Sequence, residues 1–396
     1  MTFIEQSYSL RGAYLRISLI AAALFVVATN AFVIAGVLPQ IADSLGVTPS
    51  TVSYAITWYA IIVAVLSPVV SVVFARTSRA ALMGTGLGLT AVGIAVAALA
   101  GDITMFNIGR ALAAVGGAAL MPAAMAVAPT IVPPEQRGRA LSVVGLGFTL
   151  AMAVGSPLGT AFASLGSWRL ALGTIAVLAA LLGVAIALLT RGMPAGAVPS
   201  LSARFAVLRD GRIGLALLAA LLLTVAFNVV YVFSSAVTHE ATDGSGTALA
   251  VLLGVYGVGG VIGNWLGGHL TDRFGARTTA VVALAVDTLA LVALFSVGGS
   301  YVATAIVFGV WGVVNMAALV PVQHRLVDVD PATAGVALSW YSTAMYVGIA
   351  LAPVLGASVL PFGAGWLDLL GAAATAAALG AFALGYVVRH RTAVPA

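Results

Sequence analysis

The sequence predicts an all-α membrane protein in which twelve transmembrane helices form two parallel repeats of six. The first observation is the composition, which is 62% hydrophobic and only 7% charged, with a mean hydropathy of +1.14. The second is a series of apolar runs of about twenty residues, the length that a helix needs to cross about 30 Å of hydrocarbon. The third is that the arginines gather in alternate connections. Together these exclude a single water-soluble domain.

The apolar runs are continuous, which favours helices over barrel strands, because barrel strands alternate over about ten residues. The first run follows Arg11 and Arg16, as a signal peptide would, but it is too long and lacks a small-residue cleavage site, so we expect it to be retained. In order, the runs are residues 15–38, 51–74, 80–100, 104–129, 139–163, 169–189, 214–237, 247–270, 277–297, 301–321, 333–358 and 366–388.

All seventeen basic residues are arginines, and they indicate the orientation. If alternate connections lie on opposite sides of the membrane, every arginine except Arg110 and Arg169 falls on one side. Basic residues accumulate on the cytoplasmic side, so we expect a multi-pass protein of the plasma (inner) membrane with both termini in the cytoplasm. The net charge of +5 follows from this bias, and we expect no nucleic-acid partner.

The halves of the chain carry signs of a tandem duplication. Residues 190–213 form one long polar linker between a first half, 1–189, and a second half, 214–396. The segment Gly138, Ala140, Leu141, Ser142 recurs at one constant offset as Gly335, Ala337, Leu338, Ser339, and Arg76 and Arg273 share that offset. Each half has an even number of helices, so the repeats run parallel, related by an axis along the membrane normal.

The stretch GGHLTDRFGAR (267–277), which connects the eighth and ninth runs, carries four charged or titratable side chains in eleven residues. Its residues Gly268, Leu270, Asp272, Arg273, Gly275 and Arg277 resemble the G-x-L-x-D-R-x-G-x-[KR] signature of the major facilitator superfamily. The resemblance implies that fold. It also implies a latch, that is, a set of residues that holds helices together on the cytoplasmic side: Gly268, Asp272, Arg273, Gly275, Arg277 and, in the first half, Arg76. There Ser71, Ala75 and Ser78 replace the family's Gly, Asp and Gly, so a symmetric latch is not expected.

Three further stretches are similar to the twelve-helix drug:proton antiporters and their sugar- and metabolite-efflux relatives. They are FVIAGVLPQIADSLGV (32–47), Arg110 followed by Gly116 and Gly117, and GSPLGT (155–160), whose Gly155, Pro157 and Gly159 resemble the exporters' helix-five motif. The glycines and proline also serve close helix packing and bending. Two departures stand out: Ala113 and Ala114 replace the usual Gln and Gly, and Ala31 stands where relatives often carry a glutamate.

Polar and aromatic residues on helices that line the superfamily's central cavity are the substrate-site candidates. A buried arginine or amide needs a partner or water, so these residues indicate a ligand-facing lumen, with helix-to-helix hydrogen bonding as the alternative. Aromatic and thioether side chains suit an uncharged, partly apolar ligand, although packing is their commoner use. The candidates are Asn30, Arg110, Phe148, Met152, Asn228, Tyr231, Trp311, Asn315, Tyr341, Met345 and Tyr346.

Proton coupling, which the resemblance implies, needs a titratable carrier, and arginine does not serve because it keeps its proton. Asp287 is the carboxylate nearest the middle of a span and is one candidate, with a hydrogen-bonded structural role as the alternative. Asp43 and His324, at span ends, are the next candidates. We expect Asp43 and Asp368 to lie near the outer surface, where they are solvated.

The resemblance therefore predicts a secondary active transporter that exports a small compound by alternating access, with proton antiport and a place in multidrug resistance. We expect a monomer without cofactor or metal, whose partners are a small-molecule substrate, protons and the bilayer. An uncoupled facilitator or importer of a metabolite, and a non-transporting receptor-like protein, remain alternatives. A membrane enzyme is not expected, because the sequence shows no metal-spaced cluster, nucleophile elbow or phosphate loop.

Overall fold

The structure is a computed structural model of the chain and describes residues 10–74, 77–133, 136–190, 205–297, 299–330 and 333–388. These residues form helices and connections, with no strand among them. Twelve helices in this part are long and apolar enough to cross a membrane, and each overlaps one of the twelve runs expected from the sequence. The predicted fold class, an all-α membrane protein with twelve spans, is confirmed.

Three helices of the first group follow a residue whose side chain caps free backbone N–H groups: Ser78, Asp102 and Ser167. The Asp102 carboxylate, for example, accepts from the N–H groups of Thr104 and Met105 at 2.8 and 2.9 Å and so begins the fourth span. The helices of this group are α1 (Leu10–Leu45), α2 (Pro49–Val73), α3 (Arg79–Ala98), α4 (Ile103–Gly117) with α5 (Leu120–Val127), α6 (Arg137–Leu150) with the π-helical turn η3 (Ala151–Gly155) and α7 (Ser156–Leu165), and α8 (Trp168–Leu189).

The second group repeats the pattern, with Asp210, Ser245 and Ser300 capping three of its spans. Its spans are α10 (Gly211–Val232), α13 (Gly246–Phe274), α14 (Ala276–Ser296), α15 (Tyr301–Val329), α16 (Ala334–Val359) and α17 (Gly365–Leu384). Short elements fill the connections: η1 (Ala128–Thr130) after α5, η4 (Val207–Arg209) before α10, α11 (Ser234–Val237) and α12 (His239–Thr242) before α13, and η5 (Leu360–Phe362) after α16.

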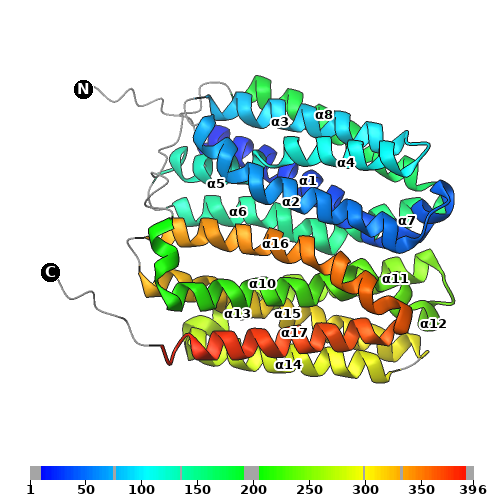
Figure 1. Cartoon of the computed structure of the whole chain (residues 1–396). Coiled ribbons are helices and arrows are strands. Elements are labelled where there is room, and N and C mark those ends of the chain that lie inside the picture. Colours follow the sequence, from blue (N-terminus) through cyan, green and yellow to red (C-terminus); the bar gives the residue numbers. More distant parts are fainter. Residues whose placement is uncertain are drawn as a thin grey trace, which may run out of the picture.

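The two groups lie side by side, with α1–α8 in the upper part of Figure 1 and α10–α17 in the lower part. We call the end where α1 begins and α17 ends the terminal end, and the opposite end the far end. The groups meet where α2 packs on α16, where α7 packs on α13 and where α1 packs on α10. At the first of these contacts the Thr57 hydroxyl donates to the Ala350 carbonyl oxygen at 2.8 Å, and both residues are buried.

The buried hydrophobic residues show how the groups are joined. One cluster contains Val37, Val52 and Phe106 of the first group together with Val229 and Ala352 of the second, all in the far half of their helices. A second cluster near the middle also contains residues of both groups. At the terminal end the buried residues instead separate into two clusters, one built from the first group and one from the second. The groups are therefore joined by hydrophobic packing toward the far end.

Close contact between the first and fifth spans depends on glycine. A Cβ atom at Gly147 would overlap the backbone oxygen of Ala21, and one at Gly155 would overlap the Thr29 hydroxyl; Gly159 makes a similar approach to α1. Small residues at these positions let the two backbones come together.

The regular helix of the fifth span is interrupted at the junction of η3 and α7. Pro157 lacks an N–H group and cannot continue the regular ladder, and the wider π turn of Ala151–Gly155 precedes it directly. The Pro157 ring faces Gly254 of α13, so this interruption lies at the contact between the two groups.

A first prediction tests the close contact that Gly147 makes with the first span. Gly147→Ala should lower the thermal stability of the purified protein, because the added methyl group meets backbone and overpacking costs about 1–3 kcal/mol. Gly145→Ala, two residues away in α6, is the matched control: nothing lies within 4 Å of its Cβ position, and alanine favours a helix by about 1 kcal/mol. Thermal unfolding in detergent should show a lower Tm for the first variant only; equal values would contradict the close contact.

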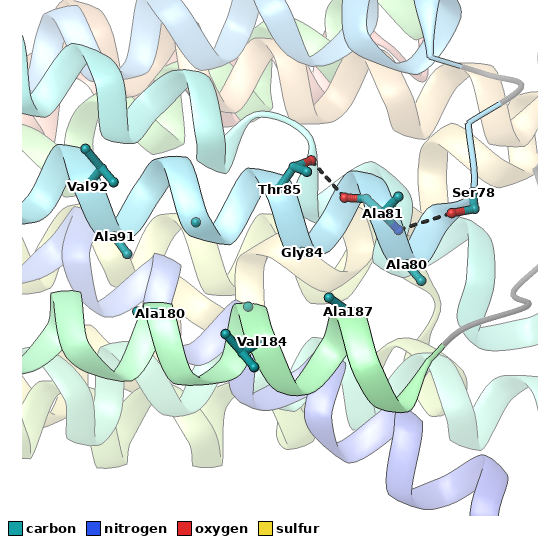
Figure 2. A pocket seen from close by; sticks show the side chains of 12 residues that line it. Ser78, Ala80, Ala81, Gly84, Thr85, Ala91, Val92, Ala180, Val184 and Ala187 are labelled. Carbon is teal, nitrogen blue, oxygen red and sulfur yellow. Dashed lines mark hydrogen bonds between the residues drawn. The ribbon is translucent and has the colours of Figure 1, made fainter.

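Small residues also line a shallow pocket between α3 and α8, shown in Figure 2. Its polar side chains are engaged locally. The Ser78 hydroxyl oxygen accepts from the N–H of Ala81 at 3.2 Å, and the Thr85 hydroxyl donates to the Ala81 carbonyl at 2.8 Å. The side chains of Val92 and Val184, at its rim, are more than half exposed. The pocket therefore offers a ligand mostly apolar surface.

Candidate functional site

A buried arginine is the main polar feature of the first group. Arg110 lies two turns into α4, and its Nη1 donates to the carbonyl oxygen and to the side-chain Oδ1 of Asn30 on α1, at 3.0 and 2.7 Å. The guanidinium carbon lies 4.7 Å from the ring centroid of Tyr59 on α2. Among the described residues, Nε and Nη2 have no hydrogen-bond partner and no carboxylate pairs with the guanidinium. This positive group can therefore still donate to an acceptor on a ligand.

A buried carboxylate is the corresponding feature of the second group. Asp287, fully buried in α14, accepts a hydrogen bond at Oδ2 from the Thr375 hydroxyl of α17 at 3.0 Å. The side chain of Asn315 on α15 lies next to this carboxylate, and its Oδ1 accepts from the Tyr256 hydroxyl of α13 at 3.1 Å. Oδ1 of Asp287 has no partner in the described part of the chain. The carboxylate can bind a proton at that oxygen.

Aromatic rings connect this carboxylate to the interface between the groups. Tyr256 packs against Trp311 with ring centroids 4.5 Å apart and stacks on Phe227 at 5.5 Å. Phe32 of α1 contacts Tyr231 of α10 at 6.0 Å, so the cluster includes both groups. We refer to six residues as the aromatic cluster: Phe32, Phe148, Phe227, Tyr231, Tyr256 and Trp311.

The remaining substrate-site candidates are more scattered. Asn228 donates to the Thr224 carbonyl of its own helix at 2.9 Å, and Tyr341 accepts from Gln323 at 3.1 Å. Met345 and Tyr346 are partly buried along α16, and the side chain of Met152 lies outside the described residues. The structure therefore forms two separate polar centres, one of Asn30 with Arg110 and one of Asn315 with Asp287. Tyr231 and Trp311 are connected to the second centre only through Tyr256, which contacts both rings and donates to Asn315.

The residues of the expected latch lie at the terminal end of α13 and α14. Gly275 forms the turn between these helices with φ of +82°, a conformation that glycine adopts without strain. Asp272 is exposed and has no hydrogen bond or ion pair to another described residue, whereas Arg273 and Arg277 lie over the rings of Phe274 and Tyr386. Gly268 has open space beside it, and Arg76 lies outside the described residues.

The candidates at the span ends differ in their surroundings. Asp43 is exposed at the far end of α1. His324 Nδ1 lies 2.9 Å from a carboxylate oxygen of Asp328 one turn along α15, and both side chains are about half exposed. The expectation that Asp368 is solvated was wrong: only 3% of this residue is exposed, because α10, α14 and the connection after α16 cover the start of α17.

The family is decided by comparison of the sequence with known families: the model described as Major Facilitator Superfamily matches residues 20–353. The chain belongs to the major facilitator superfamily. The resemblance found in the sequence motifs is thereby confirmed, and the chain is a multi-pass transporter of this superfamily.

Curated members of the superfamily align along most of the chain. A chloramphenicol resistance protein of Streptomyces lividans is 30% identical and covers 86% of this chain and 88% of its own length. A probable sugar efflux transporter of Mannheimia succiniciproducens is also 30% identical, covering 88% of both chains. Among solved structures, a mutant form of the nucleoside transporter NupG superposes with a TM-score of 0.76 at 12% identity, covering 94% of this chain and 100% of its own. The last likeness concerns the fold.

Sequence reasoning missed Tyr59, Tyr256 and Thr375, although each contacts one of the two polar centres. Single tyrosines and threonines are common in apolar spans, so they gave no signal by themselves. One signal was available for Thr375: with Asp368 it shares one face of the last span, seven residues or two helical turns away.

A second prediction concerns the exposed carboxylate of the superfamily's loop signature. Asp272→Asn should slow transport severalfold while leaving the amount of folded protein in the membrane unchanged, because we expect the Asp272 carboxylate to pair across the terminal end only when the two groups approach each other there. Initial rates in membrane vesicles, normalised to protein, measure this. Asp243→Asn, an exposed change at the far end, is the control. A wild-type rate in Asp272→Asn would contradict the latch.

Proposed function

We propose that this superfamily member is a secondary active transporter that exports a small, uncharged or partly apolar compound in exchange for protons. Two of the relatives described above are named for sugar efflux and for chloramphenicol resistance, which supports export. The aromatic cluster supports a partly apolar ligand, since binding sites for small molecules are mostly apolar surfaces with a few placed polar groups.

The observation that carries the proposal is the connection from the interface of the two groups to a buried acid. Tyr256 belongs to the aromatic cluster and donates to Asn315, which lies next to Asp287. Because Phe32 of the first group packs in the same cluster, a ligand that inserts between the groups displaces rings around Tyr256. The environment of the acid then depends on whether a ligand is bound, which is what coupling requires.

The packing of the groups supports alternating access. Hydrophobic clusters join them toward the far end, and separate clusters lie at the terminal end. We infer from the arginine distribution that the terminal end is cytoplasmic, so a compound enters from the cytoplasm in this conformation. The 1–189 and 214–396 halves, connected by residues 190–213, then rock against one another, as parallel repeats do in this type of carrier.

In this scheme the two polar centres have different roles. Arg110 and Asn30 hold polar atoms of the substrate through the free guanidinium N–H groups, and Asp287 carries the proton. We propose a monomer in the plasma (inner) membrane with both termini in the cytoplasm.

Flux measurements in proteoliposomes test the proposal. Radiolabelled chloramphenicol and a radiolabelled neutral hexose are offered separately, with an acidic lumen, an alkaline lumen and no gradient. We expect one of the probes to accumulate in acidic vesicles and a protonophore to abolish its accumulation. Equal flux under all three conditions indicates a facilitator, and the absence of flux for both probes contradicts export of these two classes of compound.

A further inference from the structure

Asp368 is a second buried acid in the second group, apart from the centre around Asp287. It is the one ionisable residue of α17 and lies in the first turn of that helix, at the far end. The residue is only 3% exposed, and its Oδ1 has no hydrogen-bond partner in the described part of the chain. Ionisable groups within membrane spans are costly, and those that persist commonly serve ion or proton pathways.

The packing of α17 on α14 places the two acids in one line. Gly365 lies against Phe295, Gly371 lies against Leu291, and Thr375 donates to Asp287, so the helices run antiparallel in a constant register. Asp368 lies seven residues before Thr375 on the same face, which is about 10 Å along the helix axis. The line of contacts therefore leads from the far end to Asp287 in two helical turns.

In the part of the chain that the structure describes, the elements that pack around Asp368 provide no countercharge. The neighbouring elements α11 and η5 carry no ionisable side chain. On α10 the Tyr231 ring packs against Phe32 and Tyr256, and on α16 Tyr346 lies near Tyr59 of the first group. The other ionisable residues of the helices that pack on α17, apart from Asp287, lie nearer the terminal end: Arg212, Arg277 and Tyr341.

We propose that Asp368 takes up a proton at the far end and passes it to Asp287. A proton from far-side water binds at Oδ1 of Asp368; the O–H bond then breaks as the proton moves through bridging water to Oδ1 of Asp287, and Asp368 returns to its carboxylate form. About 10 Å separates the acids along the helix axis, and Gly371, Ala372 and Leu291 between them offer no polar side chain. The transfer therefore requires water to enter between α14 and α17 during the transport cycle, because in this conformation the contact at Gly371 is closely packed. The inference rests on the proposed role of Asp287 in coupling.

A purely structural role of Asp368 predicts a different behaviour. A carboxylate in the first turn of a helix is stabilised by the helix dipole, and an asparagine in its place would alter stability without altering proton movement. The decisive readout is therefore the protonation of Asp287 when the pH of one compartment changes.

The experiment uses right-side-out membrane vesicles, in which we place the far end in the medium. Dicyclohexylcarbodiimide labels protonated carboxyl groups in apolar surroundings, and mass spectrometry of the peptides reports Asp287 and Asp368 separately. In wild type we expect labelling of both residues to fall severalfold when the medium is made alkaline at constant internal pH. In Asp368→Asn, labelling of Asp287 should no longer change with the pH of the medium.

Two further variants serve as controls for this test. Glu240→Gln, an exposed change in α12, should behave like wild type. Asp368→Glu keeps the carboxyl group and should restore the response of Asp287 labelling at least in part. The inference is overturned if labelling of Asp287 in Asp368→Asn changes with the pH of the medium as it does in wild type. It is also overturned if Asp368 stays unlabelled at every pH. Failure of the proposed function has a separate signature, namely wild-type substrate flux that ignores an imposed proton gradient.

Discussion

Replacing Arg110 with alanine should reduce transport to less than about a tenth of the wild-type rate, and Arg110→Lys should recover little of it. The guanidinium donates twice to Asn30 and stacks on Tyr59, and losing a buried hydrogen bond to a charged group costs about 1.5–3 kcal/mol. Lysine carries the charge but not the planar fork of donors, so it cannot hold Asn30 and offer free N–H groups to a ligand at once.

Initial rates of proton-driven uptake, normalised to folded protein, measure this effect. Arg209→Ala is the matched control, because that arginine is exposed before α10 and contacts neither polar centre. A normal rate in Arg110→Ala would make Arg110 a packing residue and remove the first polar centre from the mechanism.

Asp287→Asn should abolish the response of transport to a proton gradient while substrate exchange at equal pH continues. The amide keeps the size of the carboxylate and can still accept from Thr375, so the contact between α14 and α17 is preserved. It cannot bind and release a proton in the working range, so flux should become independent of the gradient.

The measurement compares flux with an imposed gradient and flux without one in the same liposomes, at several pH values. Asp243→Asn serves as the control, because Asp243 is exposed and has a φ of +48°, which asparagine tolerates. If Asp287→Asn kept gradient-driven flux at the wild-type level, the carrier would have to be another residue, and His324 would be the next candidate.

The fold could be predicted because hydropathy is a property of each local segment. Some helices are nevertheless longer than the apolar runs that predicted them. The helix of the first span continues to Leu45 and that of the tenth span to Val329, beyond the ends of their runs. Polar residues such as Gln40 end the apolar run, but they do not end the helix, whose backbone hydrogen bonds continue into water. Pro39 and Pro321 are accommodated within these two helices.

The candidate site could be predicted only in part, because which side chains contact each other across two helices depends on how each helix is rotated about its axis and shifted along it. Arg110, Asn30, Asn315 and Asp287 stood out as polar residues in apolar runs. Their neighbours across the helix contacts are not determined by the sequence of either helix alone. The error for Asp368 has the same origin: its position near a span end indicated solvation, whereas its exposure depends on the elements that pack over it.

The hydrogen bond from Thr57 to Ala350 makes the two faces of the carrier unequal. It joins α2 to α16 at the packed far end, so opening that end in the proposed alternating-access cycle would break a bond worth about 0.5–1.5 kcal/mol. At about 1 kcal/mol this favours the present conformation by roughly fivefold. A ligand offered at the far end must first find the rarer conformation, so its apparent affinity is weakened in proportion to that conformation's population. In the proposed cycle the bond would therefore favour loading from the terminal end over loading from the far end, even for a substrate whose intrinsic affinity is the same in both conformations.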